Sequence, residues 1–146
     1  MTHDQIIPFL IDTLKKYPDI KFDLKSNMHL TILPRNKLGF GIVLLTNERE
    51  NTLYFGDAYH WHFDNSDIEQ KEMLDQIAYG LTGVARITVW KKSNKAYKWT
   101  LELQDENGNW SNIGTTGNIN LNFWTQPELE YLQNDLLPIG KIMSNT

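Results

Sequence analysis

The residues with the clearest chemical potential lie in the run Tyr59 to Asp64, which reads Tyr-His-Trp-His-Phe-Asp. Side chains two positions apart on a strand point to the same face. An extended run therefore aligns His60, His62 and Asp64 on one face and the three aromatic residues on the other. The aromatic face is predicted to be core. The opposite face is predicted to be exposed to solvent, to bind a partner, or to form half of a metal site.

A metal site is one interpretation of this pattern. Imidazole and carboxylate groups are common ligands of zinc and iron, and two histidines separated by one residue can present His60 and His62 to one ion. The other histidines, His3 and His29, lie in no recognisable motif that would supply the missing ligands. Two further interpretations remain open. The histidines are polar residues on a solvated strand, or they belong to a protein-binding surface whose charge responds to pH.

Acidic residues follow the histidines directly. Ser66 to Glu69 have the pattern of a capping box, which opens a predicted helix, and Asp67, Glu69 and Glu72 fall on its outer face. This face could dock a basic partner such as a nuclease toxin, although a solvated helix has the same pattern and acids in the first turn suit the helix dipole. The candidate partner-binding residues are His60, His62, Asp64, Asp67, Glu69 and Glu72.

No complete catalytic motif accompanies these residues. The chain has no cysteine, which excludes disulfides, thiolate nucleophiles and cysteine-bound zinc. Residues 114–117, Gly-Thr-Thr-Gly, lack the context of a phosphate-binding loop, and no serine lies in a Gly-x-Ser-x-Gly elbow. We therefore predict a protein-binding module without a cofactor, and keep as the alternative a small metal- or ligand-binding domain or enzyme that uses His60 and His62.

Composition limits the partners. The 146 residues carry a formal net charge of −4, which argues against binding to nucleic acid or to an anionic membrane. Four lysines near residue 95 alternate with aromatic residues, which predicts that the two groups lie on opposite faces of a hairpin. The longest apolar run, residues 40–45, is far shorter than the ~20 residues needed to span a bilayer. We expect a cytoplasmic protein without a membrane segment, and the oligomeric state is open.

The predicted elements form a single α+β domain over residues 1–146, with a loose tail over residues 138–146. One helix begins near Asp4 and ends before Pro18, a second runs from the Ser66 cap to Gly83, and a third opens at residues 125–128 and ends before Pro138. Strands are predicted over residues 20–25, 28–33, 40–46, 52–55, 58–63, 84–92, 96–104, 110–113 and 119–124. The frequent hairpins predict one mainly antiparallel sheet of eight or nine strands, with three helices packed on it.

The run from Phe55 to Asp64, followed by the helix through residues 73–77, resembles small acidic bacterial proteins of the immunity type. These α+β proteins belong to polymorphic or contact-dependent toxin systems. The similarity covers roughly residues 40–137 and is specific only around the two histidines. It implies a non-enzymatic protein that neutralises a cognate toxin by covering its surface. No inhibitory residue is carried over to a position of this chain.

Overall fold

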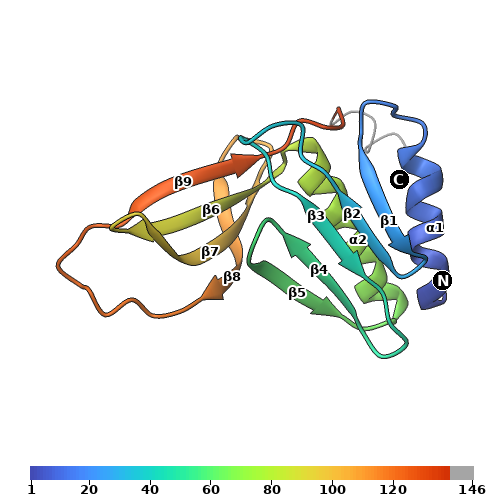
Figure 1. Ribbon diagram of the computed structural model, residues 1–146, viewed down its shortest axis with the longest axis horizontal. Coiled ribbons are helices and arrows are strands. Elements are labelled where there is room, and N and C mark those ends of the chain that lie inside the picture. Colours follow the sequence, from blue (N-terminus) through green and yellow to red (C-terminus); the bar gives the residue numbers. More distant parts are fainter. Residues whose placement is uncertain (139–146) are drawn as a thin grey trace.

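The computed structural model describes residues 1–138 and contains two antiparallel sheets with two helices. The first lobe in Figure 1 contains α1 (His3–Leu14), β1 (Phe22–Ser26), β2 (His29–Ile32), β3 (Ile42–Leu45), β4 (Asn51–Phe55), β5 (Tyr59–Phe63) and α2 (Asp67–Thr82). The second contains β6 (Ala85–Lys92), β7 (Lys95–Gln104), β8 (Trp110–Gly117) and β9 (Glu128–Gln133). The α+β class and the antiparallel pairing are confirmed.

The first sheet is a meander in the order β1-β2-β3-β4-β5, and both helices lie on one of its faces (Figure 1). Buried and half-buried side chains alternate along its central strands, so each strand buries every second side chain. Helix α2 has the predicted bounds: the Ser66 hydroxyl accepts a hydrogen bond from the Glu69 N–H at 3.3 Å, and Gly83 ends the helix with a φ of 85°.

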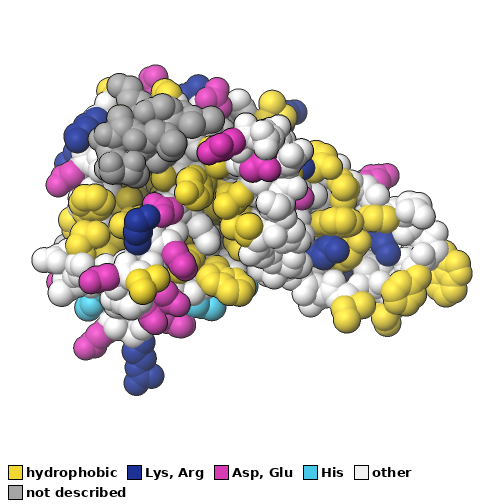
Figure 2. Space-filling model, turned by 180° about the vertical axis from the view of Figure 1, so that it is seen from behind, with side chains coloured by type: hydrophobic (Ala, Val, Ile, Leu, Met, Phe, Trp, Pro, Cys, Tyr) yellow, Lys and Arg dark blue, Asp and Glu magenta, His cyan; other side chains and the backbone are white. Residues whose placement is uncertain are grey.

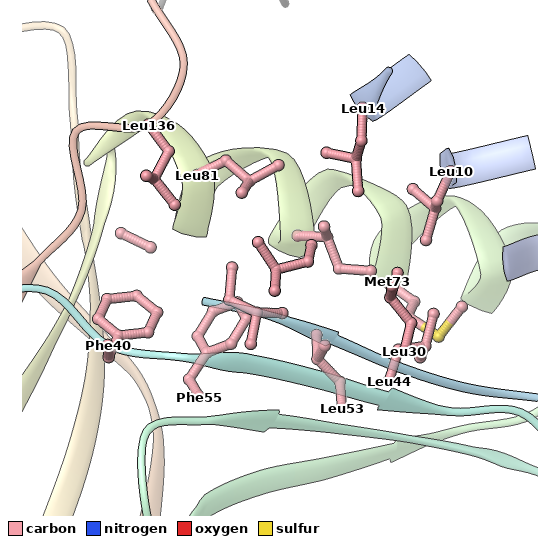
Figure 3. Packing of buried hydrophobic residues seen from close by; sticks show 14 of the residues in the cluster. Leu10, Leu14, Leu30, Phe40, Leu44, Leu53, Phe55, Met73, Leu81 and Leu136 are labelled. Atoms are coloured by element: carbon pink, nitrogen blue, oxygen red, sulfur yellow. The ribbon is translucent and has the colours of Figure 1, made fainter. Parts of the chain in front are cut away.

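The core is formed between the helices and the first sheet and continues into the second sheet. Figure 3 shows Met73 and Leu81 of α2 directed toward the sheet, and Leu10 of α1 enters the same cluster from the same side of the sheet. Ile87, Val89 and Leu101 of the second sheet belong to this cluster. Each such side chain contributes about 1.5–3 kcal/mol when fully buried, so the two sheets share their main source of stability.

Three predictions about the fold are wrong. The strands form two sheets rather than one, since β6 pairs with β7 and β9 and not with the first sheet. Residues 119–124, predicted as a strand, form a loop. The third helix is absent from the described residues, because the segment after residue 127 pairs with β6 as β9. The tail predicted over residues 138–146 lies outside the described residues apart from Pro138.

The second sheet has the order β8-β7-β6-β9, and several contacts join it to the first lobe. The chain passes from α2 into β6 through Gly83, and β5 lies beside β8, where the Tyr59 hydroxyl lies against Gly114. The buried Asn134 amide, just after β9, bonds both the N–H and the carbonyl of Phe40, each at 2.9 Å. The contact of β5 with β8 positions the strand that carries the two histidines.

Candidate functional site

The candidate site lies on the face of the first sheet opposite the two helices. Cross-strand pairing sets Tyr54 opposite His60 and Thr52 opposite His62, so these four side chains share one face. The same face continues across β3 and β2, and we call it the open face. Its residues are His29, Thr31, Val43, Leu45, Thr52, Tyr54, His60 and His62. His62 is exposed and the other seven are half-buried. The open face thus combines imidazoles with aliphatic and aromatic surface.

The two histidines lie close together and are held differently. Their ring centroids are 5.5 Å apart, and the His60 ring also packs at 5.3 Å from that of Tyr54. His60 Nδ1 lies 3.0 Å from the Ala58 carbonyl. A carbonyl oxygen only accepts, so Nδ1 carries the proton of this hydrogen bond, and Nε2 of the neutral ring is left as an acceptor. His62 Nδ1 lies 3.0 Å from the Thr52 hydroxyl and 3.5 Å from the Glu50 carboxylate.

Asp64 does not join the histidines on this face. Strand β5 ends at Phe63, and the Asp64 carboxylate accepts a hydrogen bond from the Ser66 N–H at 2.8 Å. Hydrogen bonding by Ser66, through its side chain and then its backbone, lowers the pKa of the Asp64 carboxyl below its usual value. The Asp64 N–H in turn donates to the Glu69 carboxylate. Asp64 and Glu69 therefore shape the connection into α2.

Asp67 and Glu72, the other acidic candidates, make no hydrogen bond within the segment that joins β5 to α2. Asp67 and Glu72 have exposed side chains on α2, and the exposed Glu50 carboxylate approaches His62 from the β3–β4 turn. Asn65 stabilises this end of the sheet: it donates to the carbonyls of Asn47 and Glu48, at 2.9 and 3.1 Å. Glu50 is therefore the acidic residue at the His62 end of the open face, whereas Asp67 and Glu72 lie on a helix that packs on the opposite face of the sheet.

The predicted aromatic core face of β5 is only partly buried. Tyr59 and Phe63 are buried, whereas Trp61 is 51% exposed. Strand β5 is the edge strand of the first sheet, and α2 packs against it only in part. The central residue of the strand is therefore left in contact with solvent. Alternation predicts the face that a side chain shares, but not whether another element covers it.

No group of three or more histidine and acidic side chains within residues 1–138 is arranged to hold a metal ion. His60 and His62 thus form a two-ligand fragment. A hollow of about 350 Å³ lies elsewhere, between the β4–β5 turn and the second sheet, with the Lys91–Glu130 ion pair among its lining residues. Its apolar wall is made by Ile87, Val89, Ala96, Trp99 and Leu132. It offers space for a small ligand, and none of the predicted site residues lines it.

Sequence reasoning missed the apolar end of the second lobe. Residues 119–124 carry Ile119, Leu121, Phe123 and Trp124, and all four side chains are exposed. The alternation of these residues with asparagine suggests a half-buried strand, and only the absence of a partner strand reveals an exposed loop. The prediction for the adjacent lysines also fails in part. Lys98 pairs with Trp90 on the same face, and its ammonium lies 3.8 Å from the centre of that ring.

Comparisons with protein-family models, with curated proteins and with solved structures find no match to this chain. Neither helix of residues 1–138 is long and apolar enough to cross a membrane.

Proposed function

We propose that this chain is a non-enzymatic binding module of the bacterial cytoplasm that contacts another protein through the open face. The observation that carries the proposal is the composition of this face on a sheet whose helices lie on its other side. It combines His29, His60 and His62 with the partly exposed apolar side chains of Val43 and Leu45. Polar groups beside apolar and aromatic surface are typical of a contact between proteins.

Acidic side chains beside His62 and on α2 favour a basic partner. Glu50 approaches His62, and Asp67 and Glu72 are exposed at the start of α2. Charges at the rim of an interface act mainly on the rate of association and on the choice of partner. His60 and His62 are the side chains that we expect to meet the partner on the open face, and Asp67 and Glu72 meet it where the contact extends past β5 to α2. Asp64 and Glu69 instead form hydrogen bonds that order the segment between β5 and α2.

A narrower form of the proposal is an immunity protein that neutralises a cognate toxin. The resemblance of residues 55–77 to immunity-type proteins and the acidic net charge of −4 support it. A basic nuclease toxin would meet complementary charge near His62. Covering the toxin's surface requires no catalytic group in this chain.

The test is a growth assay in which the C-terminal domain of the adjacent upstream reading frame is expressed with or without this chain. We expect that the domain is toxic and that this chain restores growth. The double variant His60→Ala/His62→Ala is expected to lose rescue while keeping its circular dichroism spectrum. His3→Ala, which changes a histidine on α1, is the matched control and is expected to rescue fully.

Two outcomes would contradict the proposal. Toxicity that this chain does not relieve removes the immunity function. Rescue that survives the double variant, with the same affinity for the purified toxin domain, removes the open face as the contact. Truncation of two side chains within an interface centre ordinarily weakens binding at least tenfold.

A metal-binding function is the second candidate, and the proximity of the two imidazole rings favours it. Its test is a titration of the untagged protein with Zn²⁺, measured by calorimetry. Stoichiometric binding that is lost in His60→Ala/His62→Ala would support a metal site and would redirect the growth assay toward metal-loaded protein. The absence of a heat signal at saturating Zn²⁺ would remove it.

A further inference from the structure

The loop that joins β8 to β9, residues 118–127, forms the far end of the second lobe (Figure 1), and we call it the tip loop. Strands β8 and β9 lie at opposite edges of their sheet, so the loop must cross the end of the β6–β7 hairpin. Four of its side chains project into solvent, with exposed fractions of 84% for Ile119, 73% for Leu121, 74% for Phe123 and 89% for Trp124.

This concentration of apolar surface is unusual for the molecule. Single exposed apolar residues are normal on protein surfaces. Within residues 1–138, however, only five large hydrophobic side chains are more than 70% exposed, and four of them lie in the tip loop. Figure 2 shows these hydrophobic side chains gathered at the outer end of the second lobe. An exposed apolar cluster of this kind marks a surface that binds a protein or a membrane.

The electrostatic surroundings of the tip loop are as distinctive as its hydrophobicity. Residues 107–127 contain no charged side chain, and the adjacent hairpin carries Lys91, Lys92, Lys95 and Lys98 without an acidic residue between them. Lys92 Nζ donates to the Asn122 carbonyl at 2.7 Å, which ties the hairpin to the loop. Lys95 is exposed at the hairpin turn. These four lysines thus adjoin the tip loop, and we call them the lysine collar.

Charge is therefore separated along the molecule. Taking these four lysines from the 14 basic residues leaves ten against 18 acidic residues, a formal charge of −8 for the rest of the chain. Glu130 forms an ion pair with Lys91, and Glu128, the residue after the tip loop, lies opposite Lys91 on β9, so four lysines and two glutamates give this end a formal charge of +2. Lys92, Lys95 and Lys98 have no acidic partner among the ion pairs of residues 1–138. The net charge of −4, which predicts repulsion from anionic surfaces, does not describe this end of the molecule.

We propose that the tip loop inserts into the surface of an anionic lipid bilayer. Aromatic and aliphatic side chains gain by leaving water for the boundary between headgroups and acyl chains, while lysine keeps its ammonium among the headgroups. Anionic lipids attract the lysine collar.

The shape of the tip loop favours a bilayer over a protein partner. A stable protein contact needs a matched surface of about 800 Å² on each side. A projecting loop with separately exposed side chains enters a fluid bilayer without such matching. This attachment is independent of the proposed protein contact, since the open face belongs to the other sheet.

The test is flotation of the purified chain with vesicles of phosphatidylcholine alone and with vesicles that also contain phosphatidylglycerol. We expect binding to the anionic vesicles that weakens as salt is added, because screening reduces the attraction of the lysines. Trp124→Ser is expected to lower the partition coefficient by about tenfold. Ile68→Ser, which removes a side chain 74% exposed on α2, is the matched control and is expected to bind as the wild type does.

The electrostatic part is tested separately. Lys95→Glu is expected to weaken binding to anionic vesicles, whereas Lys25→Glu, an equal charge change on the exposed β1, is expected to leave it unchanged. Both sites are exposed, so the variants should fold, and circular dichroism verifies this. His60→Ala/His62→Ala should bind vesicles normally, which separates this proposal from the proposed function.

Three results would overturn the proposal. One is a chain that floats with neither kind of vesicle. Another is binding that Trp124→Ser and Ile68→Ser change equally. The third is a dimer, detected by light scattering, that Trp124→Ser disrupts while no vesicle binding occurs, since the tip loop would then contact a second copy of the chain.

Discussion

Tyr59 is one of the residues at which the two sheets touch. Its ring is buried, and its hydroxyl lies against Gly114 of β8, so that a Cβ at residue 114 would collide with the phenol. Burial disfavours the phenolate, and it raises the pKa of Tyr59 to about 12. The phenol at this contact therefore stays neutral in the folded protein up to higher pH than a free tyrosine does.

This pKa predicts a loss of stability at high pH. Below pH 10 the phenol is protonated in both states. Between pH 10 and about 12 the unfolded chain releases the proton while the folded chain keeps it, so the free energy of unfolding falls as pH rises. Tyr59→Phe should lose less stability over this interval. Urea midpoints measured near pH 9 and near pH 11 test this, with Tyr131→Phe, at an exposed position, as the control. An equal alkaline loss in Tyr59→Phe and wild type would refute it.

The candidate site illustrates what local sequence can predict. The shared face of His60 and His62 follows from the two-residue period of a strand, and the pairing with β4 has this geometry. The exposure of Trp61 and the separation of Asp64 could not be predicted in this way. The exposure of Trp61 depends on which element covers β5, and contacts distant in the sequence decide that. Asp64 is separated because the strand ends at Phe63 and its carboxylate accepts from Ser66, a local turn that strict alternation does not predict.

Among the elements, the bounds of α2 could be predicted from the sequence and those of β9 could not, because local residues determine the first and tertiary pairing determines the second. The limits of α2 are determined locally by Ser66 and Gly83. Residues 125–136 also have a helical pattern, but the outer edge of β6 presents backbone groups that need partners. Six residue pairs between β6 and β9, from Arg86–Gln133 to Lys91–Glu128, meet this need. Tertiary pairing thus overrides the local preference.

The position of β9 predicts that Asn134 is a stabilising residue. Its buried amide accepts from the Phe40 N–H and donates to the carbonyls of Phe40 and Gly80. Asn134→Ala leaves these backbone groups without their partner, and we expect a loss of about 1–3 kcal/mol in the free energy of unfolding. Urea denaturation measures it. Asn107→Ala, in the exposed β7–β8 turn, should change stability by less than about 0.5 kcal/mol. Equal effects of the two variants would show that the Asn134 amide does not join β9 to the first lobe.

The two lobes of the molecule share one hydrophobic core but have different surfaces. The buried cluster runs without interruption from Leu10 of α1 to Leu101 of β7. The lobes nevertheless present opposite chemistry, with acidic residues near the histidines and lysines behind the tip loop. Under the two proposals, the second lobe meets a bilayer while the open face remains available to a protein partner.

The shared core predicts that the two lobes unfold together. Both helices pack on the first sheet, so far-UV circular dichroism at helical wavelengths reports mainly on that lobe. Trp90, Trp99 and Trp110 lie in the second sheet, so tryptophan fluorescence reports mainly on the other. Because removing either sheet would expose apolar side chains of the common cluster, we expect the two signals to give the same urea midpoint and slope. A fluorescence transition at clearly lower urea would instead mean that the second sheet melts separately and that the chain behaves as two units.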